Sequence, residues 1–200
     1  MKQTIVRKAV RVALGSFLIF SLAQCTKSGM HEEEGDMGSK RSDKSANLKK
    51  EYRATLSPLN NSGVSGTAML SLDGNMLTVT ITATGLEPGK THVHHTHGFT
   101  DNTQNSTCPT TALDTNGDGL IDLGESVPAY GPVVLDFGAL PVDAMGNASY
   151  TKTYTVAPSL MPLQNRAIVL HGLTVNGTYM VTLPVACGQI QSANNGMMGN

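Results

Sequence analysis

The sequence predicts an all-β fold, a single sandwich of antiparallel strands joined by Greek-key connections. Short runs rich in Val, Ile and Thr recur along residues 51–191, and Gly, Pro, Asn and Asp separate them. No segment of this stretch has the period of a convincing amphipathic helix. Its length suits one hydrophobic core, and therefore one domain. The expected strands cover residues 64–72, 76–84, 91–97, 133–137, 149–156, 166–170 and 178–185.

The clearest strand signal comes from residues 76–84, in which apolar residues alternate with threonine. This alternation is typical of a strand that buries one face and exposes the other. Asp73-Gly74-Asn75 precedes it and favours a tight turn, because glycine readily adopts the positive φ that such turns require. The sequence therefore predicts a hairpin around this turn.

The first 24 residues predict a signal peptide that takes no part in the fold. Its first eleven residues include four basic ones, Lys2, Arg7, Lys8 and Arg11. An apolar run over residues 12–23 follows, too short to span a membrane. The run ends in Leu22-Ala23-Gln24-Cys25, which resembles the lipobox of bacterial lipoproteins, in which the cysteine is lipidated and becomes the mature N-terminus. The lipobox implies a protein of the bacterial cell envelope, anchored to a membrane through its lipid, in the periplasm or at the outer-membrane surface. Ordinary secretion with a chance cysteine is the alternative.

Residues 25–50 and 192–200 are expected to lie outside the folded domain. The first stretch is rich in Gly, Ser, Lys and Glu and has too few apolar residues to order itself, which is typical of a flexible tether. The second is rich in Gly, Asn and Met and predicts a disordered tail. From residue 51 onward the chain has four basic and ten acidic residues, a net charge of −6. Such an acidic domain, without a Lys/Arg patch, does not bind nucleic acid, and the sequence identifies no protein partner.

Four histidines fall within six residues, in the segment His92-Val93-His94-His95-Thr96-His97. If this segment is a strand, His92 and His94 point to one face, and His95 and His97 to the other. Two imidazoles at positions i and i+2 of one face can converge on a metal ion, and imidazole suits copper, zinc, iron or nickel. A solvated polar end of a strand is the alternative.

The segment 114–125 matches the twelve-residue calcium-binding loop at each diagnostic position. The expected ligands are the carbonyl of Leu120 and the side chains of Asp114, Asn116, Asp118, Asp122 and Glu125. Hard oxygen ligands suit calcium rather than copper or zinc. A merely acidic turn is the alternative. The flanking segments, which contain Pro109, Pro128 and Pro132, do not predict helices. We therefore expect an EF-hand-like loop without its helix pair. Its calcium ion would stabilise the fold rather than drive a change of conformation as in calcium sensors.

Cys108 and Cys187 remain once Cys25 carries the lipid. An exported domain with two cysteines favours one disulfide, and two buried free thiols are the alternative. The bond would tie the segment that carries the calcium loop to the last expected strand. It closes a loop of roughly eighty residues, which contributes roughly 3–5 kcal/mol in the chain-entropy model.

Together these segments resemble the copper/zinc superoxide dismutase sandwich and the related CHRD domain. The run His-Thr-His-Gly-Phe-Thr-Asp-Asn-Thr-Gln at 95–104 resembles the dismutase segment that supplies two copper ligands, and the run 166–171 resembles the strand that ends in another copper-binding histidine. The run Ala-Cys-Gly-Gln-Ile at 186–190 resembles the dismutase segment whose cysteine closes the disulfide. The resemblance implies copper, or less readily zinc, at His95, His97 and His171. His92 and His94 stay open as a competing pair.

Departures from the dismutase pattern favour a non-catalytic role. Dismutases have a histidine that bridges copper and zinc and further zinc ligands, but this chain has no histidine between Gln104 and His171. The arginine that guides superoxide has Pro184 at its position. A negatively charged domain without that arginine offers no obvious steering for an anionic substrate. The sequence therefore predicts a lipid-anchored metal-binding protein. A copper-dependent, superoxide dismutase-like enzyme and a cell-surface adhesion or structural module are the alternatives.

Overall fold

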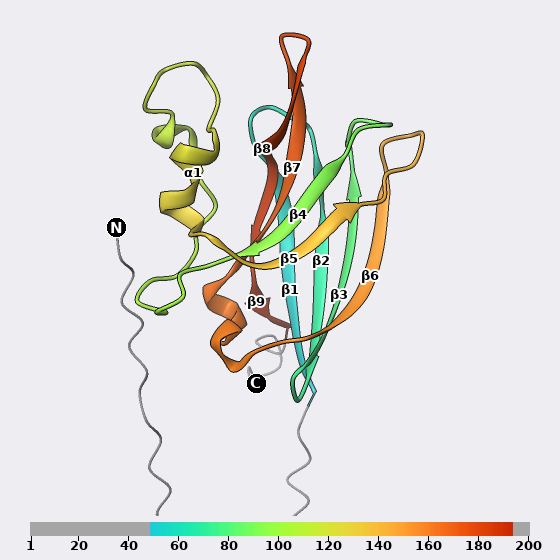
Figure 1. The fold of residues 1–200 in the computed structure, drawn as a ribbon, viewed down its shortest axis with the longest axis vertical. Helices are drawn as coiled ribbons and strands as arrows, with labels where there is room; N and C mark the ends of the chain where they lie inside the picture. Colours follow the sequence, from blue (N-terminus) through green and yellow to red (C-terminus); the bar gives the residue numbers. More distant parts are fainter. Residues whose placement is uncertain (1–48, 194–200) are drawn as a thin grey trace, which may run out of the picture. The chain divides into compact units, whose positions relative to one another are not determined.

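The computed structural model describes residues 49–193, in which one antiparallel sheet of nine strands dominates (Figure 1). The strands are β1 (Lys50–Pro58), β2 (Ser65–Asp73), β3 (Met76–Thr84), β4 (His92–His97), β5 (Val133–Leu140), β6 (Ala148–Thr155), β7 (Ala167–Val175), β8 (Thr178–Gln189) and β9 (Gln191–Ser192). The other elements of this part of the chain are the helix α1 (Leu123–Tyr130) and three single 3-10 turns, η1 (Thr111–Leu113), η2 (Pro158–Leu160) and η3 (Leu163–Asn165). The prediction of a β-fold is confirmed.

The strands follow the order β5-β4-β7-β8-β1-β2-β3-β6, and β9 pairs with β1. β1 joins the two halves of the sheet, because residues 50–56 pair with β2 whereas Ser57 and Pro58 pair with β8. The sheet coils around its core until it is nearly closed and barrel-like, and β5 and β6 form its two ends (Figure 1).

The main core lies inside the coiled sheet and follows from the alternation of side chains along each strand. Leu77, Val79 and Ile81 of β3 are fully buried. The threonines between them face outward and hydrogen-bond to threonines of β6. Asp73 pairs with Met76 across the turn, so the predicted hairpin of β2 and β3 is confirmed.

The sequence patterns do not indicate β1, although its alternation is regular. Tyr52, Ala54 and Leu56 are buried, but the strand contains few β-branched residues, and Arg53 and Thr55 stand between its buried positions. Three further strands run past their expected ends, to Leu140, Val175 and Gln189. Pairing with neighbouring strands carries these three strands past Gly138, Gly172 and Gly188, a tertiary effect that local patterns do not contain.

Several predictions for the ends of the chain lie outside the described residues. The signal peptide, the lipidated Cys25 and nearly all of the tether precede residue 49, and the tail follows residue 193 except for Ser192 and Ala193. Lys50 and Ser192, which were expected outside the folded domain, lie in β1 and β9. Within residues 49–193, no helix is both long and apolar enough to cross a membrane.

A long segment between β4 and β5, residues 98–132, lies against the outer face of the sheet and is called the β4–β5 segment below. It contains the expected calcium loop, η1 and α1 (Figure 1). A second, smaller core forms beneath it, where Tyr130 packs with Ala167, Val169 and Cys187. This segment therefore covers strands β7 and β8 from outside.

The expectation that the calcium loop has no flanking helix is wrong, because α1 begins inside the loop at Leu123. Asp122 caps this helix by accepting a hydrogen bond from the Glu125 backbone, and the Glu125 side chain accepts one from the Asp122 backbone. This reciprocal capping box stabilises the first turn. Pro128 lies within the helix, which ends two residues later at Tyr130. A proline predicts a break, yet one lost hydrogen bond is tolerated here because the helix is capped and packed against the sheet.

Candidate metal centre

Strand β4 sends its histidines to two different faces, as the alternation predicts. His92 and His94 point inward, and His94 packs against Tyr150 and Phe137 of the main core at ring-centroid distances of 4.6 and 5.3 Å. His95 and His97 point to the outer face, where their ring centroids lie 5.6 Å apart. The two pairs therefore lie in different environments.

His171 joins the outer pair from the neighbouring strand. β7 pairs with β4, and this register brings the His171 ring to 5.1 Å from His95 and 5.7 Å from His97 between centroids. One nitrogen from each of the three rings lies within 4.8 Å of the others. The structure thus brings together His95, His97 and His171, the set that the resemblance implies, and leaves His92 and His94 out of it.

Backbone carbonyls determine which nitrogen two of these rings present. A carbonyl oxygen only accepts, so the Nδ1–H of His97 donates to Gly131 at 2.9 Å and the Nδ1–H of His171 donates to Thr182 at 2.9 Å. Each Nε2 therefore carries a lone pair. Both Nε2 atoms are buried and have no hydrogen-bond partner among the described residues. Histidine metal ligands are typically held by such an outer hydrogen bond.

His95 presents its other nitrogen. Its Nε2 faces the Asp136 carboxylate at 3.4 Å, while its Nδ1 is buried without a partner in the described part of the chain. The carboxylate favours a proton on Nε2, which leaves the lone pair on Nδ1. Asp136 is itself oriented, because it accepts a hydrogen bond from the Gly138 backbone at 2.8 Å.

Burial keeps these rings neutral at physiological pH. Desolvation lowers the pKa of His97 from 6.5 to about 4 and that of His171 to about 3, and it also lowers the pKa of His95. His97 and His171 are only 1% and 2% exposed. Because a metal binds the neutral imidazole, the site does not have to lose protons when an ion enters near pH 7.

The three nitrogens fit a transition-metal ion. Metal–nitrogen bonds of about 2.0–2.1 Å place three ligand nitrogens about 3.4 Å apart, so the nitrogens, now within 4.8 Å of one another, would have to approach by at most about 1.4 Å. Buried polar atoms normally have partners, and an ion would satisfy all three lone pairs at once. Three protein ligands also leave a coordination position open for water or another small ligand.

The two inner histidines support the strands around the site. His92 is fully buried, and its Nδ1–H donates to the backbone carbonyl of His171 at 3.0 Å. Its Nε2 accepts from the Glu87 backbone at 3.1 Å. The Nδ1–H of His94 donates to Gly138 at 3.0 Å, and burial lowers the pKa of this ring to about 4.

The expected calcium loop is compact, with its carboxylates folded toward its own backbone. Asp114 accepts from the backbones of Gly117 and Gly119 at 2.8 and 2.9 Å. Glu125 closes the loop, because its Oε1 accepts from the backbone and hydroxyl of Thr115 at 2.7 and 2.8 Å. These contacts hold the pKa of Glu125 below its usual value of 4.5. The remaining expected ligands, Asn116, Asp118, Leu120 and Asp122, lie in the same turn of chain.

The predicted disulfide is confirmed. Cys108 and Cys187 are bonded, with their Cα atoms 5.6 Å apart. The bond joins the β4–β5 segment to β8, whose Cys187 lies beside Val169 of β7. A disulfide is compatible with an oxidising, extracytoplasmic location.

Asn60 is a structural residue that sequence patterns do not reveal. Its Oδ1 accepts from the Ile121 backbone at 2.7 Å, and its Nδ2 donates to the carbonyls of Ile121 and Pro184 at 3.1 and 2.9 Å. Asn60 thereby fastens the expected calcium loop to β8. The distances along the chain are too long for any local pattern to indicate these contacts.

Arg166 is a second such residue. Its guanidinium group is fully buried and donates to the backbone carbonyls of Phe99, Ser159 and Leu160 at 2.7, 3.1 and 3.1 Å. This side chain ties the start of the β4–β5 segment to the chain around η2. Its donors are therefore used within the fold.

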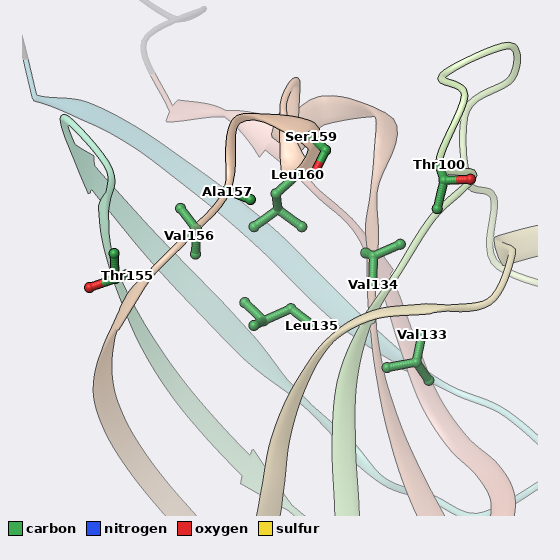
Figure 2. A pocket seen from close by; sticks show the side chains of 9 residues that line it. All are labelled: Thr100, Val133, Val134, Leu135, Thr155, Val156, Ala157, Ser159 and Leu160. Atoms are coloured by element: carbon green, nitrogen blue, oxygen red, sulfur yellow. The ribbon is translucent and has the colours of Figure 1, made fainter. Parts of the chain in front are cut away.

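An apolar pocket of about 310 Å³ lies apart from the three histidines. Figure 2 shows its valine and leucine side chains, which come from β5 and from the chain around η2, including Val134, Leu135, Val156 and Leu160. Its lining contains no His, Cys, Asp or Glu side chain.

Comparisons of the sequence with models of known protein families and with curated proteins give no match.

Proposed function

We propose that this protein is a lipid-anchored, extracytoplasmic metal-binding protein of the superoxide dismutase-like/CHRD type, with a Greek-key sandwich fold. In this proposal it holds copper at His95, His97 and His171 and calcium in the loop 114–125, and its role is non-catalytic. The observation that carries the proposal is the convergence of three buried, unpartnered ring nitrogens from two adjacent strands.

The chemistry of the three ligands supports copper first and zinc second. All three donors are neutral imidazoles, which suit copper and zinc, and the general order of affinities places copper above zinc. Calcium and magnesium prefer oxygen ligands and do not suit this group. The metal would supply Lewis acidity or redox chemistry, depending on its identity.

The calcium proposal rests on the oxygen ligands of the EF-hand-like loop and on its shape. Four carboxylates and one side-chain amide lie within twelve residues, and Gly117 and Gly119 adopt φ values of 74° and 83° that let the chain fold tightly around an ion. Asn60 and α1 hold the end of this loop against the rest of the fold. A loop held in this way supports a structural ion.

The non-catalytic role is supported by what surrounds the histidines. Pro184, which stands at the position of the guiding arginine, pairs directly with His171 across β7 and β8. Arg166 donates to backbone carbonyls inside the fold, so it does not offer its charge to an incoming anion. Fast superoxide turnover depends on attraction of the anion to the site.

Metal analysis of the purified mature protein, together with a superoxide assay on its copper-loaded form, tests this proposal. The expected result is one transition-metal ion and one calcium ion for each chain. The rate of superoxide decay should be close to that in buffer without protein. High turnover would favour the dismutase-like enzyme. A protein that binds no transition metal in wild-type form would favour the adhesion or structural module.

A further inference from the structure

Helix α1 connects the EF-hand-like loop directly to a histidine of the metal centre. The helix starts next to Asp122, at the end of the loop, and ends at Tyr130. The Tyr130 ring packs on His97, with 4.2 Å between ring centroids. The next residue, Gly131, accepts the Nδ1–H of His97 at 2.9 Å. The contacts that set the orientation and the tautomer of His97 therefore both come from the C-terminal end of α1.

Tyr130 and Gly131 are held firmly in place. The Tyr130 side chain is fully buried, and its hydroxyl hydrogen-bonds to Ser126, one helical turn earlier, at 2.6 Å. The Ser106 hydroxyl donates to the carbonyl of Tyr130 at 2.8 Å. Gly131 has a φ of 83°, and a Cβ at this position would lie 2.6 Å from the backbone of Gly98. This close approach, which only glycine allows, brings the Gly131 carbonyl to His97.

The N-terminal end of the same helix depends on the loop. Glu125 caps α1 through its Oε2, which accepts from the Asp122 backbone at 3.2 Å. Its Oε1 accepts from Thr115 on the opposite side of the loop. A calcium ion that takes both oxygens of this carboxylate changes the two contacts together. An ion in the loop would therefore alter the contacts at the start of α1.

We propose that α1 is a positioning element that makes the affinity of the histidine site depend on the state of the loop 114–125. This inference rests on the proposed function, which places copper at the histidines and calcium in the loop. Calcium bound by both Glu125 oxygens would replace the hydrogen bonds that these oxygens accept with stronger ionic contacts that fix the start of α1, which reduces the entropy lost when His97 is fixed around an ion. Each metal then strengthens the binding of the other by the same factor, because such coupling is reciprocal.

The positioning role is tested with Tyr130→Phe and Ser126→Ala, which each remove one partner of the buried hydroxyl pair and leave the three ligands in place. Copper(II) affinity, measured by competition with a chelator, should fall about tenfold in each variant. The double variant should lose no more than either single variant, because both remove the same contact. Tyr154→Phe removes a comparable hydroxyl on β6 and should leave the affinity unchanged.

Two spectroscopic signals separate positioning from a general loss of stability. Nitrogen-15 NMR of the metal-free protein should show the proton of His97 on Nδ1 in the wild type and a mixture of tautomers in Tyr130→Phe. The electron paramagnetic resonance spectrum of the copper(II) form should change in the same variant and not in Tyr154→Phe. Unchanged affinity, tautomer and spectrum in both α1 variants would overturn the positioning role.

The coupling to the loop is tested by titrating copper(II) with and without saturating calcium. Calcium should raise the affinity for copper(II) about fivefold in the wild type. Glu125→Gln keeps an oxygen that can cap α1 but loses the charge that calcium needs, so it should abolish the calcium effect. If calcium binds and stabilises the protein but leaves copper affinity unchanged, the coupling is wrong and the proposed function stands. If calcium does not bind while the α1 variants still weaken copper binding, the positioning role stands and the calcium part of the proposed function fails.

Discussion

The choice of ring nitrogen is the most specific feature of the molecule at the scale of single residues. His97 and His171 present Nε2 because backbone carbonyls hold their Nδ1 protons, and His95 presents Nδ1 because Asp136 faces its other nitrogen. Sequence alternation alone places the histidines on the correct faces of β4. It does not determine the nitrogens, because the carbonyls and the carboxylate come from other strands and from the β4–β5 segment.

Removing a ligand should affect metal binding far more than removing an inner histidine. His97→Ala and His171→Ala should each lower the affinity for copper by at least about 100-fold, more than the loss of an outer hydrogen-bond partner costs. His94→Ala and His92→Ala should largely preserve copper binding, because neither ring belongs to the set of three ligands. The loss of affinity should be the smaller of the two in His94→Ala. Isothermal titration of the purified variants checks this ranking. Equal losses at all four positions would contradict it.

The buried rings also predict how stability depends on pH. The pKa values of His94 and His97 are lowered from 6.5 to about 4, and that of His171 to about 3. Between these values and pH 6.5 the unfolded chain binds more protons than the folded one, so stability is full above pH 6.5 and is lost as the pH falls toward 4 and then 3.

Each of these histidines contributes at most about 1.4 kcal/mol for each pH unit. Denaturant unfolding of the metal-free protein should therefore show a free energy of unfolding lower by at least about 2 kcal/mol near pH 5 than near pH 7. The drop should be smaller in His171→Gln, which removes the ring with the most strongly lowered pKa. A wild-type protein equally stable at both pH values would refute the neutral, buried state of the rings.

At the scale of elements, the loop 114–125 and α1 form one unit because Asp122 and Glu125 take part in both. The capping box begins the helix, and the same Glu125 carboxylate closes the loop on Thr115. A change at Glu125 therefore reaches beyond the loop itself.

Calcium should raise the stability of this unit and of the whole domain. A ligand that binds only the folded state contributes about 2.7 kcal/mol when its free concentration is about 100 times Kd. Glu125→Gln should remove most of this gain in thermal-denaturation scans with calcium and with chelator. Asp143→Asn, the same chemical change in an exposed turn outside the loop, serves as the control and should retain the gain. A midpoint that calcium and chelator leave unchanged would mean that the loop binds no calcium.

Local patterns predict some elements well and others poorly, for identifiable reasons. The hairpin of β2 and β3 follows from strict alternation around Asp73-Gly74-Asn75, a signal contained within a few residues. α1 escapes prediction because Pro128 suggests a break, and only the cap and the packing of Tyr130 compensate for it. The structural role of Asn60 cannot be predicted from local sequence, because its hydrogen-bond partners lie far along the chain. The grouping of His171 with His95 and His97 came from a resemblance, since no local rule pairs β4 with β7.

At the scale of the whole molecule, several connections fix the β4–β5 segment over the three histidines. The disulfide joins Cys108 to Cys187, Asn60 holds Ile121, and His97 donates to Gly131. The segment is thus attached near its start, in its middle and at its end. The geometry of the three histidines depends on this arrangement, because the β4–β5 segment covers β7 and supplies the hydrogen-bond partner of His97.

Loss of the disulfide should destabilise the domain without changing its ligands. The bonded cysteines are 79 positions apart, so Cys108→Ser combined with Cys187→Ser should lower the free energy of unfolding by about 3–5 kcal/mol in the chain-entropy model. Denaturant unfolding of the metal-free protein measures the change. Mass spectrometry of the non-reduced wild type should find no free thiol at either position, and alkylation of both cysteines would rule out the bond.

The central place of β1 has a mechanical consequence. Any pull on the chain from its N-terminal side enters the described fold at Lys50, the first residue of a strand that pairs with β2 along residues 50–56 and with β8 at Ser57 and Pro58. The load therefore reaches an interior strand before any strand at an end of the sheet. Several backbone hydrogen bonds must yield before β1 detaches, and its detachment separates the two halves of the sheet. If the predicted tether and lipid anchor carry this domain, its resistance to force resides in β1, the first strand of the described fold.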